Sequence, residues 1–372
     1  MKYQKILLLC LIILASYWTS GCQNKGDKDE SADFNQYIYT HGNYAYTDNE
    51  YIFFENGQLF FVDSLLSSAL SKICTRPECQ HTDDSCSSYV DSRAIFSSAN
   101  YLYYITRDEK GKYGAYEMDL EGQARRCIKK LPMLDSGNIG FSYKFYNNYL
   151  VLEVTKWKAD SAYYMVYLTD FTDKNSKIEI IFGAEDNSDI VYGGTELRDG
   201  WVFATEVYAN SKNKTLVGYK IEEKEYHKLV DNWTFSNTIS LKGDMLYWFE
   251  AGVGFFSLSL STMEERKYSD CDATYEYGPG LYDDKYLYLT NTIPQLDKLG
   301  IIDETKKGIY IYDYEGHLKQ YISTVGTPIY PVYCLSSPEY VFFYDAAGNK
   351  LPKYYIEKKS ICNGNASLLT LE

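Results

Sequence analysis

Met245-Leu-Tyr-Trp248 is one of seven short aromatic and aliphatic runs that recur along this chain of 372 residues. The other six begin at Tyr51, Tyr101, Tyr149, Gly200, Tyr286 and Tyr340, so the runs start 41 to 54 residues apart. A repeat of this length built from short strands is typical of propeller blades. The sequence therefore predicts an all-β fold, a β-propeller with seven blades. Six blades is the alternative, if the unit that starts at Tyr51 and carries an unusual insertion is degenerate.

A second strand is expected after each of these runs, at residues 58–63, 114–119, 163–168, 215–220, 254–258, 308–313 and 353–356. The first strands are nearly continuous in apolar residues, a pattern that indicates strands covered on both faces. Propeller blades meet this condition because each blade packs between two neighbours. More polar runs such as Lys177–Ile181 and Leu318–Ile322 are expected to be outer strands facing water. Either Tyr37–Tyr39 or Ser367–Thr370 is expected to complete the last sheet.

The N-terminus has the features of an export signal. Lys2 and Lys5 precede an apolar stretch at residues 6–15, which is short for a membrane span. Thr19-Ser-Gly-Cys22 follows and resembles the lipobox of bacterial lipoproteins, in which the signal is cut and the cysteine becomes the lipidated first residue. The chain departs from the lipobox at Thr19, where leucine is usual. The alternative is an ordinary secretory signal cut near Ala15 or Gly21.

These features divide the chain into a lipoprotein signal peptide at 1–21, a lipidated Cys22 with a flexible tether at 22–35, and a propeller at 36–372. Residues 23–33 are polar and charged, as tethers are. Residues 1–21 hold two lysines and no acid, which leaves 35 basic and 51 acidic residues and a net charge of −16. No basic cluster interrupts this acidity, so nucleic acid is not expected as a partner. The lipid is expected to anchor the protein to the extracytoplasmic face of a bacterial cell membrane.

Several of the strands resemble those of a known propeller class. Tyr247-Trp-Phe-Glu250 is similar to the YWTD strand of low-density-lipoprotein-receptor propellers. Two second strands resemble that class's ending of strand, Asp, two residues and Gly, at Asp119–Gly122 and Asp313–Gly316. Together with the lipobox, the chain resembles Firmicutes-type lipoproteins of unknown function with a receptor-like propeller, over roughly residues 36–372. The resemblance implies a fold and a surface location, but no activity, because propellers carry many functions.

One cluster of chemically versatile residues interrupts the repeat. It reads Cys74-Thr-Arg-Pro-Glu-Cys79-Gln-His81-Thr-Asp-Asp-Ser-Cys86, with the spacing C-x4-C-x-H-x4-C. Three thiolates and an imidazole can enclose a tetrahedral zinc ion, and such a closed set is structural because a catalytic zinc keeps one position open. The run also resembles a Cys-Pro-Cys-His-Cys segment of the same lipoproteins.

Oxidation is the competing hypothesis for these cysteines. Thiols outside the cytoplasm tend to form disulfides, and Cys86 could pair with Cys79 or with Cys74. Once Cys10 is removed with the signal and Cys22 is lipidated, seven cysteines remain, so they cannot all pair within one chain. Free thiols are the third possibility. The remaining four, Cys127, Cys271, Cys334 and Cys362, are expected to be small buried apolar residues.

The leading functional hypothesis is a surface-tethered binding protein whose ligand, a glycan, a peptide or an envelope protein, meets one end of the propeller. It rests on the anchor, the tether and the lack of a recognisable catalytic motif. The runner-up is an enzyme, a polysaccharide lyase or glycosidase, which would need Asp, Glu, Tyr or His side chains from different blades in one pocket. A structural subunit of a surface complex is the third hypothesis.

Overall fold

The structure is a computed structural model that describes residues 44–47, 50–55, 58–62 and 71–371. Within the last range, residues 75, 83–84, 93–94, 99–100, 160, 186, 209–210, 212, 234–238, 251–253, 269–280, 291–304, 306, 328, 337–338 and 346–351 are outside the description. The predicted signal, Cys22, the tether and the possible closing strand Tyr37–Tyr39 therefore lie outside the described residues.

The first four sheets each contain four consecutive antiparallel strands. They are β1 (Tyr44–Thr47), β2 (Glu50–Glu55), β3 (Gln58–Val62) and β4 (Ser71–Lys72); β5 (Phe96–Ser98), β6 (Tyr101–Arg107), β7 (Tyr113–Asp119) and β8 (Arg126–Lys130); β9 (Ile139–Tyr146), β10 (Tyr149–Lys158), β11 (Ser161–Asp170) and β12 (Glu179–Gly183); and β13 (Ile190–Arg198), β14 (Trp201–Tyr208), β15 (Lys214–Lys220) and β16 (Glu225–Val230).

The next three sheets repeat the same order. They are β17 (Ile239–Lys242), β18 (Met245–Glu250), β19 (Gly254–Ser259) and β20 (Glu265–Tyr268); β21 (Leu281–Tyr282), β22 (Tyr286–Thr290), β23 (Gly308–Asp313) and β24 (Leu318–Ser323); and β25 (Ile329–Ser336), β26 (Tyr340–Asp345), β27 (Tyr354–Glu357) and β28 (Leu369–Thr370). A 3-10 turn, η2 (Pro132–Asp135), and a short helix, α4 (Lys358–Cys362), complete the described elements.

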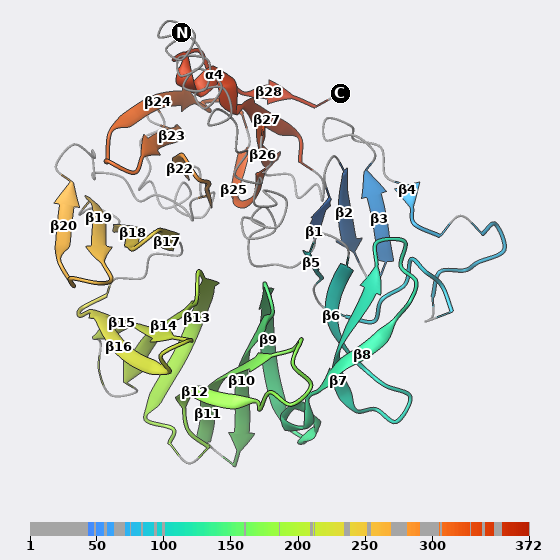
Figure 1. Ribbon diagram of the computed structural model, residues 1–372. Helices are drawn as coiled ribbons and strands as arrows, with labels where there is room; N and C mark the ends of the chain where they lie inside the picture. The colour runs from blue at the N-terminus through green and yellow to red at the C-terminus, as the bar shows by residue number, and fades with distance from the viewer. Residues whose placement is uncertain are drawn as a thin grey trace, which may run out of the picture.

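Figure 1 shows the sheets arranged as a ring, with the first strand of each sheet nearest the centre and the fourth at the rim. The prediction of an all-β propeller is confirmed. Each of the seven aromatic runs falls in the second strand of one sheet, and each expected second strand falls in the third. The described residues contain seven such sheets, while the number of blades in the whole chain stays a prediction.

The blades pack against each other through both faces of their inner strands. In β14, Trp201 and Phe203 belong to a core cluster shared with the fifth sheet, whereas Val202 and Ala204 belong to one shared with the third. Successive side chains of a strand point to opposite faces, so a strand with a neighbouring blade on each side must be apolar throughout. The continuous apolar runs of the sequence therefore have the physical cause that was expected.

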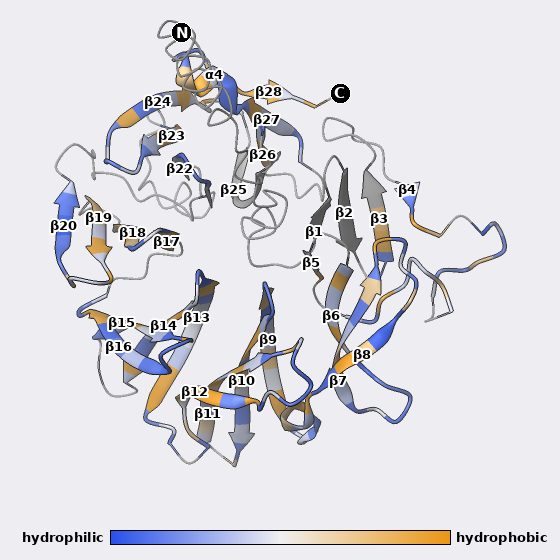
Figure 2. Ribbon diagram, viewed as in Figure 1, coloured by the Kyte–Doolittle hydropathy of each residue, from blue (hydrophilic) through white to orange (hydrophobic). Residues whose placement is uncertain are grey.

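The outer strands meet water and are polar. Three of the four side chains of β20 are exposed, and Figure 2 shows this strand as largely hydrophilic at the rim of the ring. The last sheet is closed by β28, so the closing strand is the predicted C-terminal one. Within the described residues, no helix has the length and apolar character needed to cross a bilayer.

The two sequence endings in which a strand is followed by Asp, two residues and Gly, at Asp119–Gly122 and Asp313–Gly316, form tight turns. Each of these turns contacts the preceding blade. Asp313 Oδ1 accepts hydrogen bonds from the backbone N–H groups of Glu315 and His317, at 3.0 and 2.8 Å. Gly316 has a φ of +83° and lies so close to the Tyr268 ring of the fifth sheet that an added Cβ would be 2.7 Å away. The aspartate thus shapes the turn, and the glycine allows both the positive φ and the close contact.

Candidate functional site: a cysteine and histidine cluster between two blades

The segment after β4 packs between the first and second sheets. The N–H of Leu59 in β3 donates a hydrogen bond of 2.6 Å to the carbonyl oxygen of Ser88. Val90 and Ile95 of this segment join Leu59 and residues of the second sheet, including Leu102, in one buried cluster. The segment therefore fills the joint between two blades with apolar side chains and extends the hydrogen bonding of the first sheet.

The same segment is also fastened to the turn between β7 and β8. Arg125 donates hydrogen bonds from Nη2 to the carbonyl oxygens of Cys86, at 2.9 Å, and of Ser87, at 3.2 Å. Gly122 of that turn, with a φ of +75°, lies directly under Ser87, where an added Cβ would be 2.0 Å from the carbonyl oxygen. The residues around Cys86 thus contact both blades.

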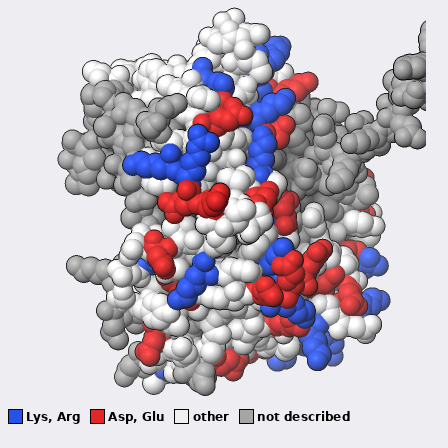
Figure 3. Space-filling view, turned by 60° about the vertical axis from the view of Figure 1, so that its left-hand side comes forward, with Lys and Arg blue, Asp and Glu red and all other residues white. Residues whose placement is uncertain are grey.

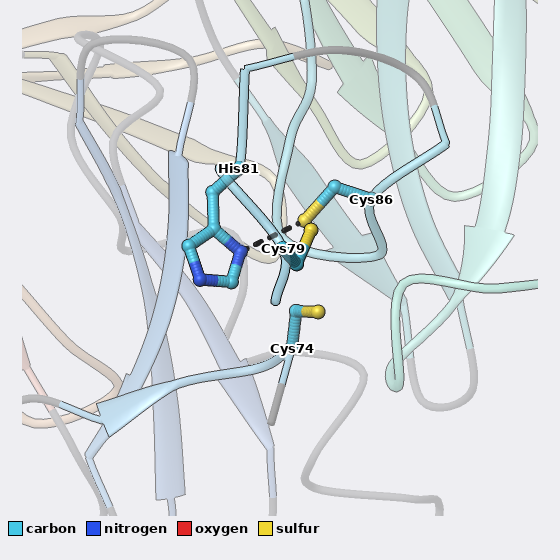
Figure 4. Close-up of side chains that lie close together, drawn as sticks. All are labelled: Cys74, Cys79, His81 and Cys86. Atoms are coloured by element: carbon cyan, nitrogen blue, oxygen red, sulfur yellow. Dashed lines mark hydrogen bonds between the residues drawn. The ribbon is translucent and has the colours of Figure 1, made fainter. Parts of the chain in front are cut away.

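The four predicted ligand residues converge in this joint (Figure 4). The three sulfur atoms and one ring nitrogen of Cys74, Cys79, His81 and Cys86 all lie within 4.8 Å of one another. His81 Nδ1 is 3.1 Å from Cys86 Sγ. Cys74 and Cys86 are buried, and the other two are half-buried.

Local backbone geometry brings these side chains together. A turn closes on the Cys79 N–H, which donates to the carbonyl oxygen of Arg76 at 3.2 Å. His81 has a φ of +58°, a left-handed conformation that reverses the chain toward Cys86. Ser88 holds the base of the cluster, because its N–H donates to Cys86 Sγ at 3.3 Å and its hydroxyl oxygen accepts from the Cys74 N–H.

Arg76 supplies positive charge beside the sulfur atoms. Its Nη2 lies 3.6 Å from Cys79 Sγ and donates to the Ser85 carbonyl oxygen at 2.6 Å. A hydrogen bond from Arg76 lowers the pKa of Cys74 from 9.0 to about 6, which favours the thiolate. Burial has the opposite effect on Cys86 and raises the pKa of its thiol. The thiols of Cys74 and Cys86 therefore differ in their ease of ionisation.

The donor set fits a zinc ion. Zinc–sulfur bonds of about 2.3 Å place the sulfur atoms of a tetrahedral site about 3.8 Å apart, within the spread of this cluster. A disulfide needs only two of the three sulfur atoms and makes no use of an imidazole. His81 Nδ1, 3.1 Å from Cys86 Sγ, lies close enough to the sulfur atoms to be a fourth ligand of the same ion.

Five cysteines of the described residues are free thiols, namely Cys127, Cys362 and the three of the cluster. The expectation that the scattered cysteines are buried is wrong for Cys127 and Cys362, which are exposed. Cys271 lies outside the described residues, and Cys334 lies in β25.

A second group with possible metal ligands, Asp313, Glu315 and His317, belongs to the turn described above. Asp313 Oδ2 accepts from Lys319 Nζ at 2.7 Å and lies 3.3 Å from His317 Nδ1, while Oδ1 binds the turn backbone. Both carboxylate oxygens are therefore already used within the fold, and the group serves the turn.

Sequence reasoning missed Arg76, Ser88 and Arg125, which fix the cluster from outside its ligand set. Arg76 stands inside the cysteine run, and its charge among three thiols was a usable signal. Arg125 lies 39 residues from Cys86, and its contact depends on how the blades pack, which the sequence pattern does not specify.

No protein-family model matches this sequence, and a search of curated proteins finds no match either. Among solved structures, a prolyl endopeptidase is similar over 96% of this chain and 52% of its own, at 10% identity and a TM-score of 0.53. This chain thus spans about half the length of that enzyme. At this identity the likeness supports the propeller fold alone.

Two further structures are weaker matches. The computationally designed protein Ika8 is similar over 89% of this chain and 97% of its own, at 11% identity and a TM-score of 0.49. BamB from Moraxella catarrhalis is similar over 83% and 80%, at 10% identity and a TM-score of 0.43. With TM-scores below 0.5, neither bears on the function of this chain.

Proposed function

We propose that this chain is a lipid-anchored binding protein on the extracytoplasmic face of a bacterial membrane, with a zinc ion fastening its first two blades. The lipobox-like Thr19–Cys22 supports the anchor. One observation carries the zinc: the chemically versatile cluster of the sequence lies in a joint between blades. Three thiols and an imidazole face one another there, and the surrounding hydrogen bonds go to backbone groups of the fold. Such a closed set favours a structural site over a catalytic one.

In this proposal, Cys74, Cys79, His81 and Cys86 hold the zinc. A structural zinc stabilises the folded state because the unfolded chain has no preformed site. Within this protein, it would keep the segment around Ser87 and Ser88 in contact with both the first sheet and Arg125. Loss of the metal is therefore expected to loosen the joint without changing the other blades.

The anchor is tested through Cys22. The wild-type protein and a Cys22→Ser variant are produced in a bacterium fed a clickable fatty acid, and the cells are separated into membrane and soluble fractions. We expect wild type to take up the lipid and fractionate with the membrane. The variant is expected to carry no lipid and to leave the membrane fraction. Equal lipid labelling of both proteins would overturn the assignment of Cys22.

The binding role fits the surface of the domain. Figure 3 shows lysine and arginine interspersed with aspartate and glutamate on one side of the molecule, with neither sign forming a continuous field. Nucleic-acid binding requires a concentration of positive charge, so a protein, peptide or glycan partner is favoured. Cross-linking of the tagged protein in intact cells, with a Cys22→Ser control that leaves the membrane, should enrich envelope components in the wild-type sample alone.

A further inference from the structure

A pocket of about 410 Å³ opens between the sixth and seventh sheets. The sixth sheet contributes Asp284 from the turn before β22 and Tyr286, the first residue of β22. The seventh contributes Glu339 and Tyr340 at the start of β26, and Glu357 and Lys358 from the junction of β27 and α4. Its volume falls in the range of small-ligand pockets, about 300–1,000 Å³. The lining comes from three separate segments of two blades, so packing alone assembles it.

An ion pair below the pocket holds these segments in place. Lys358 Nζ lies 2.7 Å from Asp283 Oδ2, and the two side chains are only 12% and 2% exposed. Asp283 Oδ2 also accepts from the Tyr288 hydroxyl at 2.7 Å, and its Oδ1 accepts from the N–H groups of Lys285 and Tyr286, at 2.8 Å each. The Lys358 N–H donates to the carbonyl oxygen of Glu339 at 2.8 Å.

Asp283 and Asp284 are adjacent acidic residues in the turn before β22. The structure separates their roles, because Asp283 is buried in the network while Asp284 is exposed and lines the pocket. Lys358 joins the turns of two blades through both its backbone and its side chain. This network holds the segments of the lining in a defined arrangement, and such preorganisation lowers the entropy cost of binding.

The two tyrosine rings of the lining are oriented by neighbouring rings. Tyr340 packs edge-on against Tyr355 with ring centroids 5.7 Å apart, and Tyr286 packs edge-on against Tyr288 at 6.3 Å. The Tyr286 hydroxyl also lies 3.2 Å from Cys362 Sγ. Both rings remain partly exposed, so each presents an apolar surface in a fixed orientation.

The lining carries similar numbers of acidic and basic side chains. The acids are Asp284, Glu339 and Glu357, and the lysines are Lys285, Lys358 and Lys359. Lys358 is paired with the buried Asp283, and Lys359 is paired with Glu357. A pocket for an anionic ligand would be expected to carry excess positive charge, and a pocket for a cation excess negative charge. Closely spaced donors and acceptors beside an apolar ring instead match a neutral molecule with many hydroxyl groups and an apolar face.

We propose that this pocket binds a neutral carbohydrate, with Tyr286 and Tyr340 against sugar rings and the surrounding carboxylates and ammonium groups bound to hydroxyls. This inference rests on the proposed binding function and names its ligand class. It also meets the condition set for the enzyme hypothesis, since carboxylates of two blades share one pocket. The test therefore measures cleavage of the sugar as well as its binding.

The experiment uses the full mature protein in a detergent without a sugar headgroup. Maltotriose, cellotriose and triacetylchitotriose are the neutral probes, and trigalacturonate is the anionic comparison. Ligand-observed NMR gives the dissociation constants, and mass spectrometry of each sugar after incubation reports cleavage. We expect saturable binding of at least one neutral trisaccharide, at least tenfold tighter than trigalacturonate, and no cleavage.

Variants locate the binding to the pocket. Tyr286→Ala and the isosteric Glu339→Gln, each checked for an unchanged thermal midpoint, are expected to weaken binding at least tenfold. The control is Tyr101→Ala, which removes a tyrosine that is 40% exposed and lies on the second sheet. Failure of all three neutral probes, or equal binding by the pocket variants, would overturn this inference and leave the anchored binding protein standing. Cleavage of a bound sugar would keep the pocket and overturn the non-enzymatic function.

Discussion

Gly122 lies against the carbonyl oxygen of Ser87, so close that a Cβ at this position would be 2.0 Å from that oxygen. Ser87 belongs to the segment of the cysteine cluster, and Gly122 to the turn between β7 and β8 of the next blade. The equivalent turn of the sixth sheet places Gly316 against Tyr268 of the fifth. In both places a glycine lets a turn of one blade touch the blade before it.

Gly122→Ala is expected to destabilise the protein by roughly 3 kcal/mol or more, because strain at positive φ adds to a backbone clash. The matched control is Gly111→Ala. Gly111 has nearly the same φ, +74° against +75°, but no atom within 4 Å of an added Cβ. The control is expected to cost only about 1 kcal/mol. Chemical denaturation of the two variants measures both values.

The difference between the two variants isolates the contact with Ser87. If both variants lose the same stability, the segment that carries the cluster moves away from Gly122 at little cost. The first two blades are then not held together by a tight contact at Ser87.

Lys358→Ala is expected to destabilise the protein by about 3–5 kcal/mol, since it leaves the buried Asp283 carboxylate without its cation. Lys359→Ala is the neighbouring control. That side chain is 81% exposed and pairs with Glu357 at 3.3 Å, so its loss is expected to cost less than about 1 kcal/mol. Urea unfolding followed by tryptophan fluorescence compares the two. Equal effects would show that the pair beneath the pocket does not hold the last two blades together.

The folded protein is expected to lose stability above about pH 10. Burial raises the pKa values of Tyr247 and Tyr286 to about 12 and that of Tyr288 well above its usual value, while an unfolded tyrosine titrates near 10. Because the folded values are the higher ones, this contribution is fully present below pH 10 and is lost as the pH rises toward 12.

Thermal midpoints at pH 8, 9, 10 and 11, with tyrosinate absorbance recorded in parallel, measure this effect. In Tyr247→Phe, which has no titrating group at that position, the fall from pH 9 to 11 is expected to be smaller. A midpoint that stays constant while tyrosinate forms in the folded protein would contradict the raised pKa values of these tyrosines.

Cys79→Ser is expected to lose the bound zinc and to lower the thermal midpoint by at least ~5 °C, because zinc binds the folded state alone. Cys127→Ser removes an exposed thiol of β8 and serves as the control. Zinc content by plasma mass spectrometry and calorimetry compare the variants. A Cys79→Ser protein with the wild-type midpoint and no change in metal content would exclude a structural zinc.

The strands were predictable because their composition reflects local physics. Trp201, Val202, Phe203 and Ala204 alternate between two neighbouring blades, so a continuous apolar run was the necessary signal. The convergence of His81 with Cys86 was also predictable, because close spacing in the sequence limits how far apart the side chains can lie. The choice between zinc and a disulfide was not, since both use the same cysteines.

The pocket and the supports of the cluster depend on packing between blades. Arg125 reaches Cys86, and Lys358 reaches Asp283, only because two blades pack in a particular way. Arg125 and Asp283 stand in turns, where they resemble ordinary polar turn residues. No periodicity in the sequence distinguishes them from their exposed neighbours.

Mass spectrometry of the mature protein, extracted from the bacterial membrane without reductant, examines the lipid anchor and the zinc site in one measurement. Under native conditions, we expect a chain that begins at Cys22, carries lipid and holds one zinc ion. Under denaturing conditions, the zinc should be lost and the mass should match fully reduced Cys74, Cys79 and Cys86. A chain without lipid would contradict the anchor. A chain without zinc, with a mass lower by two hydrogen atoms because two of these cysteines form a disulfide, would contradict the zinc site.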